Sequence, residues 1–271
     1  GSEILKQITA YIRHKPISIL LLTLPLAYLA EILHWGPLWV FTLSAISVIP
    51  LAAYIGEGTE ALAKYTNPRV GGLLNATLGN AAELIITIVA IRAGLLELVK
   101  ASITGSILGN LLLVMGLSMV AGGLRNGMQS FDRRQASRNA ILLVLAVIAL
   151  IIPSIFSGYI DNPQSTRVEA LSVGTAIVRM VLSGLSLLYS FRFARSPISH
   201  KSTEQIIHES TWSIRKSVII LTLATVGVVF ASEILIGAVE PVMVSFGISE
   251  FFIGIILIPL IGNVAEHFVA V

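Results

Sequence analysis

Long apolar stretches separated by short polar segments dominate the chain. Their length suits α-helices that cross a bilayer, which need about 20 apolar residues each. None shows the sustained apolar/polar alternation that is typical of barrel strands. We therefore predict an all-α polytopic membrane protein. The pattern gives eight candidate spans, at Ile17–Leu33, Leu38–Leu62, Val70–Ile91, Ala101–Gly122, Ala140–Phe156, Val168–Phe191, Val218–Ala238 and Phe251–Val271.

The composition supports this interpretation. Hydrophobic residues make up 55% of the 271 positions and charged residues only 12%, whereas a soluble protein carries about a quarter charged residues. The chain has no cysteine, which excludes disulfides and thiol chemistry. No cluster of basic residues belongs to a soluble region, so we expect a lipid bilayer and no nucleic acid as a partner.

The positions of Lys and Arg predict the orientation, because cytoplasmic loops carry an excess of them. Arg92, Lys100 and Arg167 lie on one side of the predicted membrane. The other side holds Lys6, Arg13, Lys15, Lys64, Arg69, Arg125, Arg133, Arg134, Arg138, Arg192, Arg195, Lys201, Arg215 and Lys216. We therefore expect a cytoplasmic N-terminus. Arg179 falls inside the sixth span, where it either snorkels or pairs with an intramembrane acid.

A short polar motif occurs twice within apolar runs, as GNAAE at Gly79–Glu83 and as GNVAE at Gly262–Glu266, 183 residues apart. The same offset aligns Gly71 with Gly254, Leu74 with Leu257, and Glu57 with Glu240. The motifs lie in the third and eighth spans, which differ by five helices. The second copy is therefore expected to enter the membrane from the opposite face, as in the inverted repeats of transporters.

This repeat predicts two inverted five-helix units preceded by one extra N-terminal helix. We expect residues 1–36 to form the tail and extra helix, 37–195 the first repeat, 196–214 a cytosolic linker, and 215–271 the start of a second, incomplete repeat. Channels and intramembrane enzymes can also be duplicated, so the repeat alone does not assign a function.

A carboxylate within a membrane is costly unless it faces a cavity or a partner. Ala76, Asn80, Glu83 and Thr87 step at intervals of four, three and four, which on a helix places them on one face. Gly79 beside them permits close backbone approach or local unwinding that frees carbonyl oxygens.

The second motif repeats this arrangement with Asn263 and Glu266. Gly262 and Pro259 weaken its helix. We predict one ion site built from Glu83, Glu266, Asn80, Asn263, Gly79 and Gly262.

The predicted ligands are all oxygen, which suits Ca²⁺ with its irregular coordination by six to eight oxygens. Mg²⁺ dehydrates reluctantly and fits less well, and neither motif offers a soft sulfur ligand. Two neighbouring carboxylates repel each other, which favours protonation when the cation leaves. Such a site can exchange a divalent cation for protons. The alternative is that these Asn and Glu side chains only join helices by hydrogen bonds.

Other polar residues surround this predicted site. Ser102, Ser106 and Asn110 repeat every four residues beside small glycines, so Ser106 and Asn110 either line the cavity or belong to a packing seam. His267 follows Glu266 and either tunes it, shuttles a proton or packs. The pair Glu57 and Glu240 could line ion entrances.

The sequence resembles the cation/proton exchanger (CAX) family of the Ca²⁺:cation antiporter superfamily. The resemblance rests on GGLLNATLGNAAELI, VKASITGSILGNLLLVMGLS and FFIGIILIPLIGNVAEH. It implies Ca²⁺/H⁺ antiport by alternating access in a plasma (inner) or vacuolar membrane. It also implies that the glutamates matching Glu83 and Glu266 carry the ions, with Asn80 and Asn263 nearby. The helices matching the second and seventh spans are expected to slide, and three further helices are expected after the eighth.

Three other functions compete with this interpretation. Na⁺-driven Ca²⁺ exchangers of the same superfamily resemble a Gly-Thr-Ser-x-Pro-Glu pattern, whereas this chain has Asn-Ala-Ala and Asn-Val-Ala, which favours protons. A passive cation channel is a weaker alternative. An intramembrane enzyme lacks support, because no Ser/His/Asp constellation or His-rich metal site occurs, so no enzymatic activity is expected.

Overall fold

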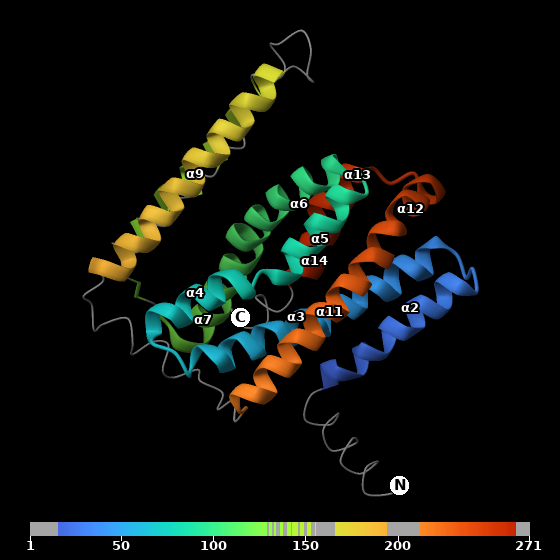
Figure 1. Ribbon diagram of the computed structural model, residues 1–271, viewed down its shortest axis with the longest axis horizontal. Helices are drawn as coiled ribbons and strands as arrows, with labels where there is room; N and C mark the ends of the chain where they lie inside the picture. Colours follow the sequence, from blue (N-terminus) through green and yellow to red (C-terminus); the bar gives the residue numbers. More distant parts are fainter. Residues whose placement is uncertain are drawn as a thin grey trace, which may run out of the picture. The chain divides into compact units, whose positions relative to one another are not determined.

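The structure is a computed structural model that describes residues 16–128, 166–193 and 212–263, with scattered positions between 130 and 155. No strand occurs in these ranges, and all their regular elements are helices (Figure 1). The chain divides into two compact units, one made of Gly1–Gly127 with His208–Val271 and the other of Met128–Ile207. Each unit is described by itself.

The first unit contains the helices that position the repeated polar motifs. Before the second unit these are the 3₁₀-helix η1 (Pro16–Leu22), α2 (Thr23–Ile32), α3 (Pro37–Ala63), α4 (Pro68–Leu78), α5 (Ala81–Arg92), α6 (Leu96–Leu108), the π-helix η2 (Gly109–Val114) and α7 (Met115–Asn126). After it come α11 (Ile214–Gly237), α12 (Val239–Phe246), α13 (Glu250–Phe252), the π-helix η4 (Ile253–Leu257) and α14 (Ile258–Gly262). The second unit contains α9 (Thr166–Phe193).

Among the described residues, three helical stretches are long and apolar enough to cross a membrane: Pro37–Ala63, Leu96–Asn126 and Ile214–Phe246. They overlap the second, fourth and seventh predicted spans. Shorter apolar helices at Pro16–Ile32, Ser172–Leu185 and Glu250–Gly262 overlap the first, sixth and eighth. The fifth predicted span is described only at scattered positions, and the part of the eighth after Asn263 lies outside the described residues.

The third predicted span is not one continuous helix. It is divided into α4 and α5 by Gly79 and Asn80, and Asn80 has φ −92° and ψ 13°. A Cβ atom on Gly79 would collide with the carbonyl oxygen of Asn75, so glycine is needed at this turn. The interruption falls within the helix on which Ala76, Asn80, Glu83 and Thr87 were expected to share a face. It lies where local unwinding beside Gly79 was predicted.

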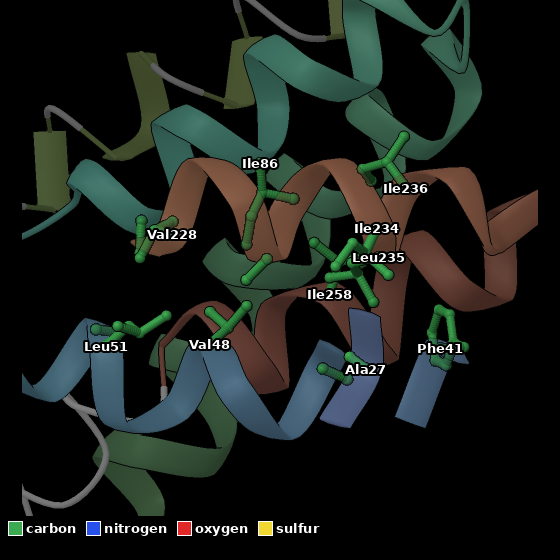
Figure 2. Close-up of a cluster of buried hydrophobic side chains, with 14 of the residues drawn as sticks. Ala27, Phe41, Val48, Leu51, Ile86, Val228, Ile234, Leu235, Ile236 and Ile258 are labelled. Carbon is green, nitrogen blue, oxygen red and sulfur yellow. The ribbon is translucent and has the colours of Figure 1, made fainter. Parts of the chain in front are cut away.

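The core of the first unit lies between α3 and α11. The two helices pack closely in antiparallel directions, because a Cβ atom on Gly58 would contact Leu221, and one on Gly227 would lie 2.7 Å from Cδ2 of Leu51. Figure 2 shows Val48 and Leu51 of α3 pointing towards Val228 of α11, with further apolar side chains from α2, α5 and α14. This packing forms the scaffold against which α5 is held.

Helix α6 packs against the segment Glu250–Gly262, which consists of α13, η4 and α14 (Figure 1). Glycine allows the close approach on both sides. A Cβ atom on Gly105 would meet the carbonyl oxygen of Ile255, and one on Gly254 would lie 2.7 Å from Cβ of Ala101. The residue numbers of the contacting pairs rise together along α6 and along Glu250–Gly262, so the two segments run parallel.

Candidate functional site

Three polar side chains from three separate helical segments form a hydrogen-bonded network. The hydroxyl of Ser106 donates to Oε1 of Glu83 at 2.6 Å. The amide Nδ2 of Asn263 donates to Oγ of Ser106 at 3.1 Å. Asn263 is almost completely buried, with 2% of its surface exposed, and Glu83 and Ser106 are half-buried. The network therefore joins the first GNxAE motif to the second through one serine.

The break between α4 and α5 places Glu83 in the network. Asn80 is the N-cap residue of α5, and Glu83 lies in the first turn. The first N–H groups of a helix have no partner within it and carry partial positive charge, so a carboxylate is stabilised there. The broken helix thus offers a favourable position for an anion within an apolar segment.

The second motif has the same backbone geometry at the equivalent residue. Asn263 ends α14 with φ −95° and ψ 6°, close to the φ −92° and ψ 13° of Asn80. Both asparagines follow a glycine and stand three residues before a glutamate. The two asparagines thus depart from ideal helical backbone angles in the same way.

The glycine of the second motif touches the glutamate of the first. A Cβ atom on Gly262 would lie 3.0 Å from Cγ of Glu83 and 3.8 Å from its Oε1. This close approach is possible because glycine has no side chain. Together with the Asn263–Ser106–Glu83 bonds, it brings the two motifs face to face.

A cavity of about 400 Å³ lies beside this network, between α6 with η2 and η4 with α14. Asn263 is one of its lining residues, and it is also the residue that bonds Ser106. The remaining walls are mainly apolar, and they are formed by Gly105, Leu108, Gly109, Leu112, Leu113, Ile255, Ile256, Pro259 and Leu260. The polar network therefore adjoins an apolar hollow.

The other predicted residues occupy different parts of the fold. Thr87 is half-buried one turn beyond Glu83 on α5, and Asn110 is exposed in the π-helix η2. Glu57 is half-buried on α3, and Glu240 is exposed in the first turn of α12. Within the described residues, no three His, Asp or Glu side chains are grouped to hold a metal ion. Glu266 and His267 lie outside those residues.

Sequence reasoning missed Glu250. Its Oε1 accepts a hydrogen bond of 2.7 Å from the backbone N–H of Leu98, in the first turn of α6. The only local signal was Ser249, whose hydroxyl caps α13 by accepting from the N–H of Phe252. That signal predicts a helix start but not a bond to a helix 152 positions away.

The sequence matches the family model described as Sodium/calcium exchanger protein over residues 36–192 and 216–271. A Ca(2+)/H(+) antiporter of Aphanothece halophytica is 40% identical over 265 residues, which are 93% of this chain and 71% of that protein. The Ca(2+)/H(+) antiporter ChaA of Bacillus subtilis (strain 168) is 41% identical over 247 residues, 90% of this chain and 69% of that one. Vacuolar cation/proton exchanger 1a of Oryza sativa subsp. japonica is 35% identical, and the chain spans 59% of its length.

A solved structure is also similar. The structure of native YfkE superposes with a TM-score of 0.76 at 36% sequence identity, covering 94% of this chain and 72% of that chain. The helical fold and the family match thus agree with each other and with the motifs from which the resemblance was first inferred. The chain belongs to the sodium/calcium exchanger protein family, within its cation/proton exchanger group.

Proposed function

We propose that the protein is a secondary antiporter that exchanges Ca²⁺ for H⁺ across a membrane. The observation that carries this proposal is the Glu83–Ser106–Asn263 network, which joins the two GNxAE motifs at one place. The names of the relatives from Aphanothece halophytica and Bacillus subtilis, both Ca(2+)/H(+) antiporters, support it.

The proposed Ca²⁺ ligands are the oxygen atoms of the two motifs. Glu83 and Glu266 supply carboxylates, Asn80 and Asn263 supply amide oxygens, and Gly79 and Gly262 mark the breaks where backbone carbonyls become available. Ca²⁺ accepts such mixed sets of oxygen ligands at 2.3–2.6 Å, and waters complete them. In the ion-free site, the hydroxyl of Ser106 offsets part of the cost of holding the Glu83 carboxylate away from water.

Proton coupling follows from competition for the same carboxylates. Ca²⁺ requires the ionised form of Glu83 and Glu266, whereas an empty site with two neighbouring carboxylates favours the uptake of protons. The two occupants exclude each other because each needs the same oxygen atoms. Binding Ca²⁺ therefore releases protons, and binding protons releases Ca²⁺.

Alternating access would rest on two repeats of opposite orientation in the membrane. Residues 37–195 form the first repeat and residues 215–271 the start of the second. The matching backbone breaks at Asn80 and Asn263 support this relation. Glu57 and Glu240, near the ends of their helices, are proposed to line entrances on opposite sides, with the N-terminus in the cytoplasm. Ser106, Asn110, Thr87 and His267 are proposed to line or tune the site.

The test is Ca²⁺ uptake into proteoliposomes that contain the full-length protein, followed with a Ca²⁺-sensitive dye. A pH gradient and a Na⁺ gradient are imposed separately, with the membrane voltage clamped by K⁺ and valinomycin. Uptake should follow the pH gradient, reverse when that gradient is reversed, and be lost in Glu83→Gln. Uptake that ignores the pH gradient would refute proton coupling.

A second candidate is Na⁺-driven Ca²⁺ exchange, which the description of the matching family favours. The Na⁺ arm of the same assay decides between the two. A Na⁺-driven exchanger takes up Ca²⁺ at constant pH while Na⁺ leaves the vesicle down its gradient. Uptake without any counter-ion would instead indicate a channel.

A further inference from the structure

Helix α6 is capped by a side chain from a distant part of the chain. Its N-cap residue Leu95 has no side-chain cap bond, so the first N–H groups of the helix need other acceptors. Glu250 supplies one, because its Oε1 lies 2.7 Å from the backbone nitrogen of Leu98. A carboxylate suits this position, because the helix N-terminus carries partial positive charge.

After this bond along the chain direction, α6 and the segment Glu250–Gly262 contact each other through small residues. A Cβ atom on Gly254 would lie 2.7 Å from the carbonyl oxygen of Leu98, and one on Gly105 would lie 2.7 Å from Cγ of Pro259. Small residues allow two helices to approach closely in a membrane. The glycines bring the two backbones close together along this interface.

The other end of the same interface is the ion-site network. Ser106 stands eight residues beyond Leu98 on α6, about 12 Å along the axis at 1.5 Å per residue. Asn263 follows the last residue of the segment that begins with Glu250. A shift of one residue along α6, about 1.5 Å, would break the 3.1 Å bond that Asn263 donates to Ser106 across this interface. The two hydrogen bonds, one at each end, therefore fix the register of the interface.

We propose that Glu250 is a positioning residue for the ion site: by capping α6 it sets the register that holds Ser106 between Glu83 and Asn263. Glu250 acts through α6 and does not touch the transported ion. This inference rests on the proposed function for its transport consequences, but its structural part can be measured without transport.

The test compares three variants of the full-length protein in proteoliposomes. Glu250→Ala removes the acceptor, and Glu250→Gln retains an acceptor oxygen in the same place. Glu97→Ala is the matched control, because Glu97 is an exposed acid in the same first turn of α6. Two quantities are measured: the amide hydrogen exchange of the peptides that contain Leu98 and Ser106, and the Ca²⁺ concentration that half-saturates exchange.

In Glu250→Ala, we expect amide exchange to be about tenfold faster at Leu98 and detectably faster around Ser106, with half-saturation at about tenfold higher Ca²⁺. We expect Glu250→Gln and Glu97→Ala to stay within about threefold of the wild type, because neither removes the acceptor for Leu98. A fall in maximal rate that Glu250→Gln does not rescue would indicate a different role and overturn the inference.

Unchanged protection at Ser106, or faster exchange at Leu98 with unaltered Ca²⁺ dependence, would also overturn it. If the wild-type protein does not exchange Ca²⁺ for H⁺, the proposed function fails instead. The positioning role is then decided by the amide protection around Ser106 alone, which must fall in Glu250→Ala and recover in Glu250→Gln.

Discussion

A methyl group added at Gly262 probes the contact between the two motifs directly. In Gly262→Ala, the new Cβ would lie 3.0 Å from Cγ of Glu83. Carbon atoms prefer separations of about 3.5–4.0 Å, so the Glu83 side chain must move by a few tenths of an ångström. Oxygen ligands lie 2.3–2.6 Å from a bound Ca²⁺, so moving the Glu83 carboxylate changes its fit to the ion.

This displacement should weaken Ca²⁺ binding. Forcing a methyl group into a packed position costs about 1–3 kcal/mol, and 1.4 kcal/mol corresponds to a tenfold change in an equilibrium constant. We expect the Ca²⁺ concentration for half-maximal exchange to rise about 10- to 100-fold. The assay is the initial rate of Ca²⁺ uptake into proteoliposomes at a fixed pH gradient, measured over a range of Ca²⁺ concentrations.

The matched control is Gly237→Ala at the end of α11, where an added Cβ meets no atom within 4 Å. We expect this variant to bind Ca²⁺ as the wild type does and to gain up to about 1 kcal/mol of stability from helix propensity. The reasoning is refuted if Gly262→Ala retains wild-type Ca²⁺ dependence, or if both variants weaken it equally.

Four further predictions concern the same site and its support. Ser106→Ala should lower the free energy of unfolding by about 1.5–3 kcal/mol in denaturant titrations, because it removes a bond to a carboxylate and an acceptor for the buried Asn263. The control Thr104→Val removes a hydroxyl bonded to its own helix backbone and should lower it by less than about 1 kcal/mol. Equal losses in the two variants would contradict the network. Glu83→Gln should keep the wild-type melting temperature yet show no exchange. Normal transport in this variant would show that Glu83 serves only in packing. Gly105→Ala should lower the melting temperature by several degrees, about 1–3 kcal/mol, whereas Gly109→Ala, with open space around its Cβ, should not. Acidifying the side from which Ca²⁺ binds should raise the half-saturating Ca²⁺ concentration, because protons occupy the same carboxylates; a pH-independent value would exclude this competition.

Much of the fold could be predicted from apolar periodicity. The second, fourth and seventh spans appear as long helices because each is an uninterrupted apolar run of sufficient length. The break at Gly79 and Asn80 was harder to predict, since the whole run from Val70 to Ile91 is apolar enough to be helical. The break depends on the close approach of Gly79 to the carbonyl oxygen of Asn75 and on the turn at Asn80, which hydropathy does not register.

The site was predicted in part. The repeated motif indicated Glu83 and Asn263, and the four-residue spacing indicated Ser106, but only the fold brings these three together. Spacing along one helix cannot specify which residue of another helix lies opposite. The bond from Leu98 to Glu250 illustrates this limit, because it depends on how two helices pack in parallel through glycine contacts.

The central claim is that one pair of carboxylates carries Ca²⁺ and protons in turn. The most direct measurement follows both ions at once in proteoliposomes, with a Ca²⁺ dye and a pH dye inside the vesicles and no Na⁺ present. The account predicts that Ca²⁺ entry is accompanied by proton exit in a fixed ratio, and that Glu83→Gln and Glu266→Gln each abolish both fluxes. Ca²⁺ entry without proton movement, or coupled fluxes that survive both substitutions, would contradict it.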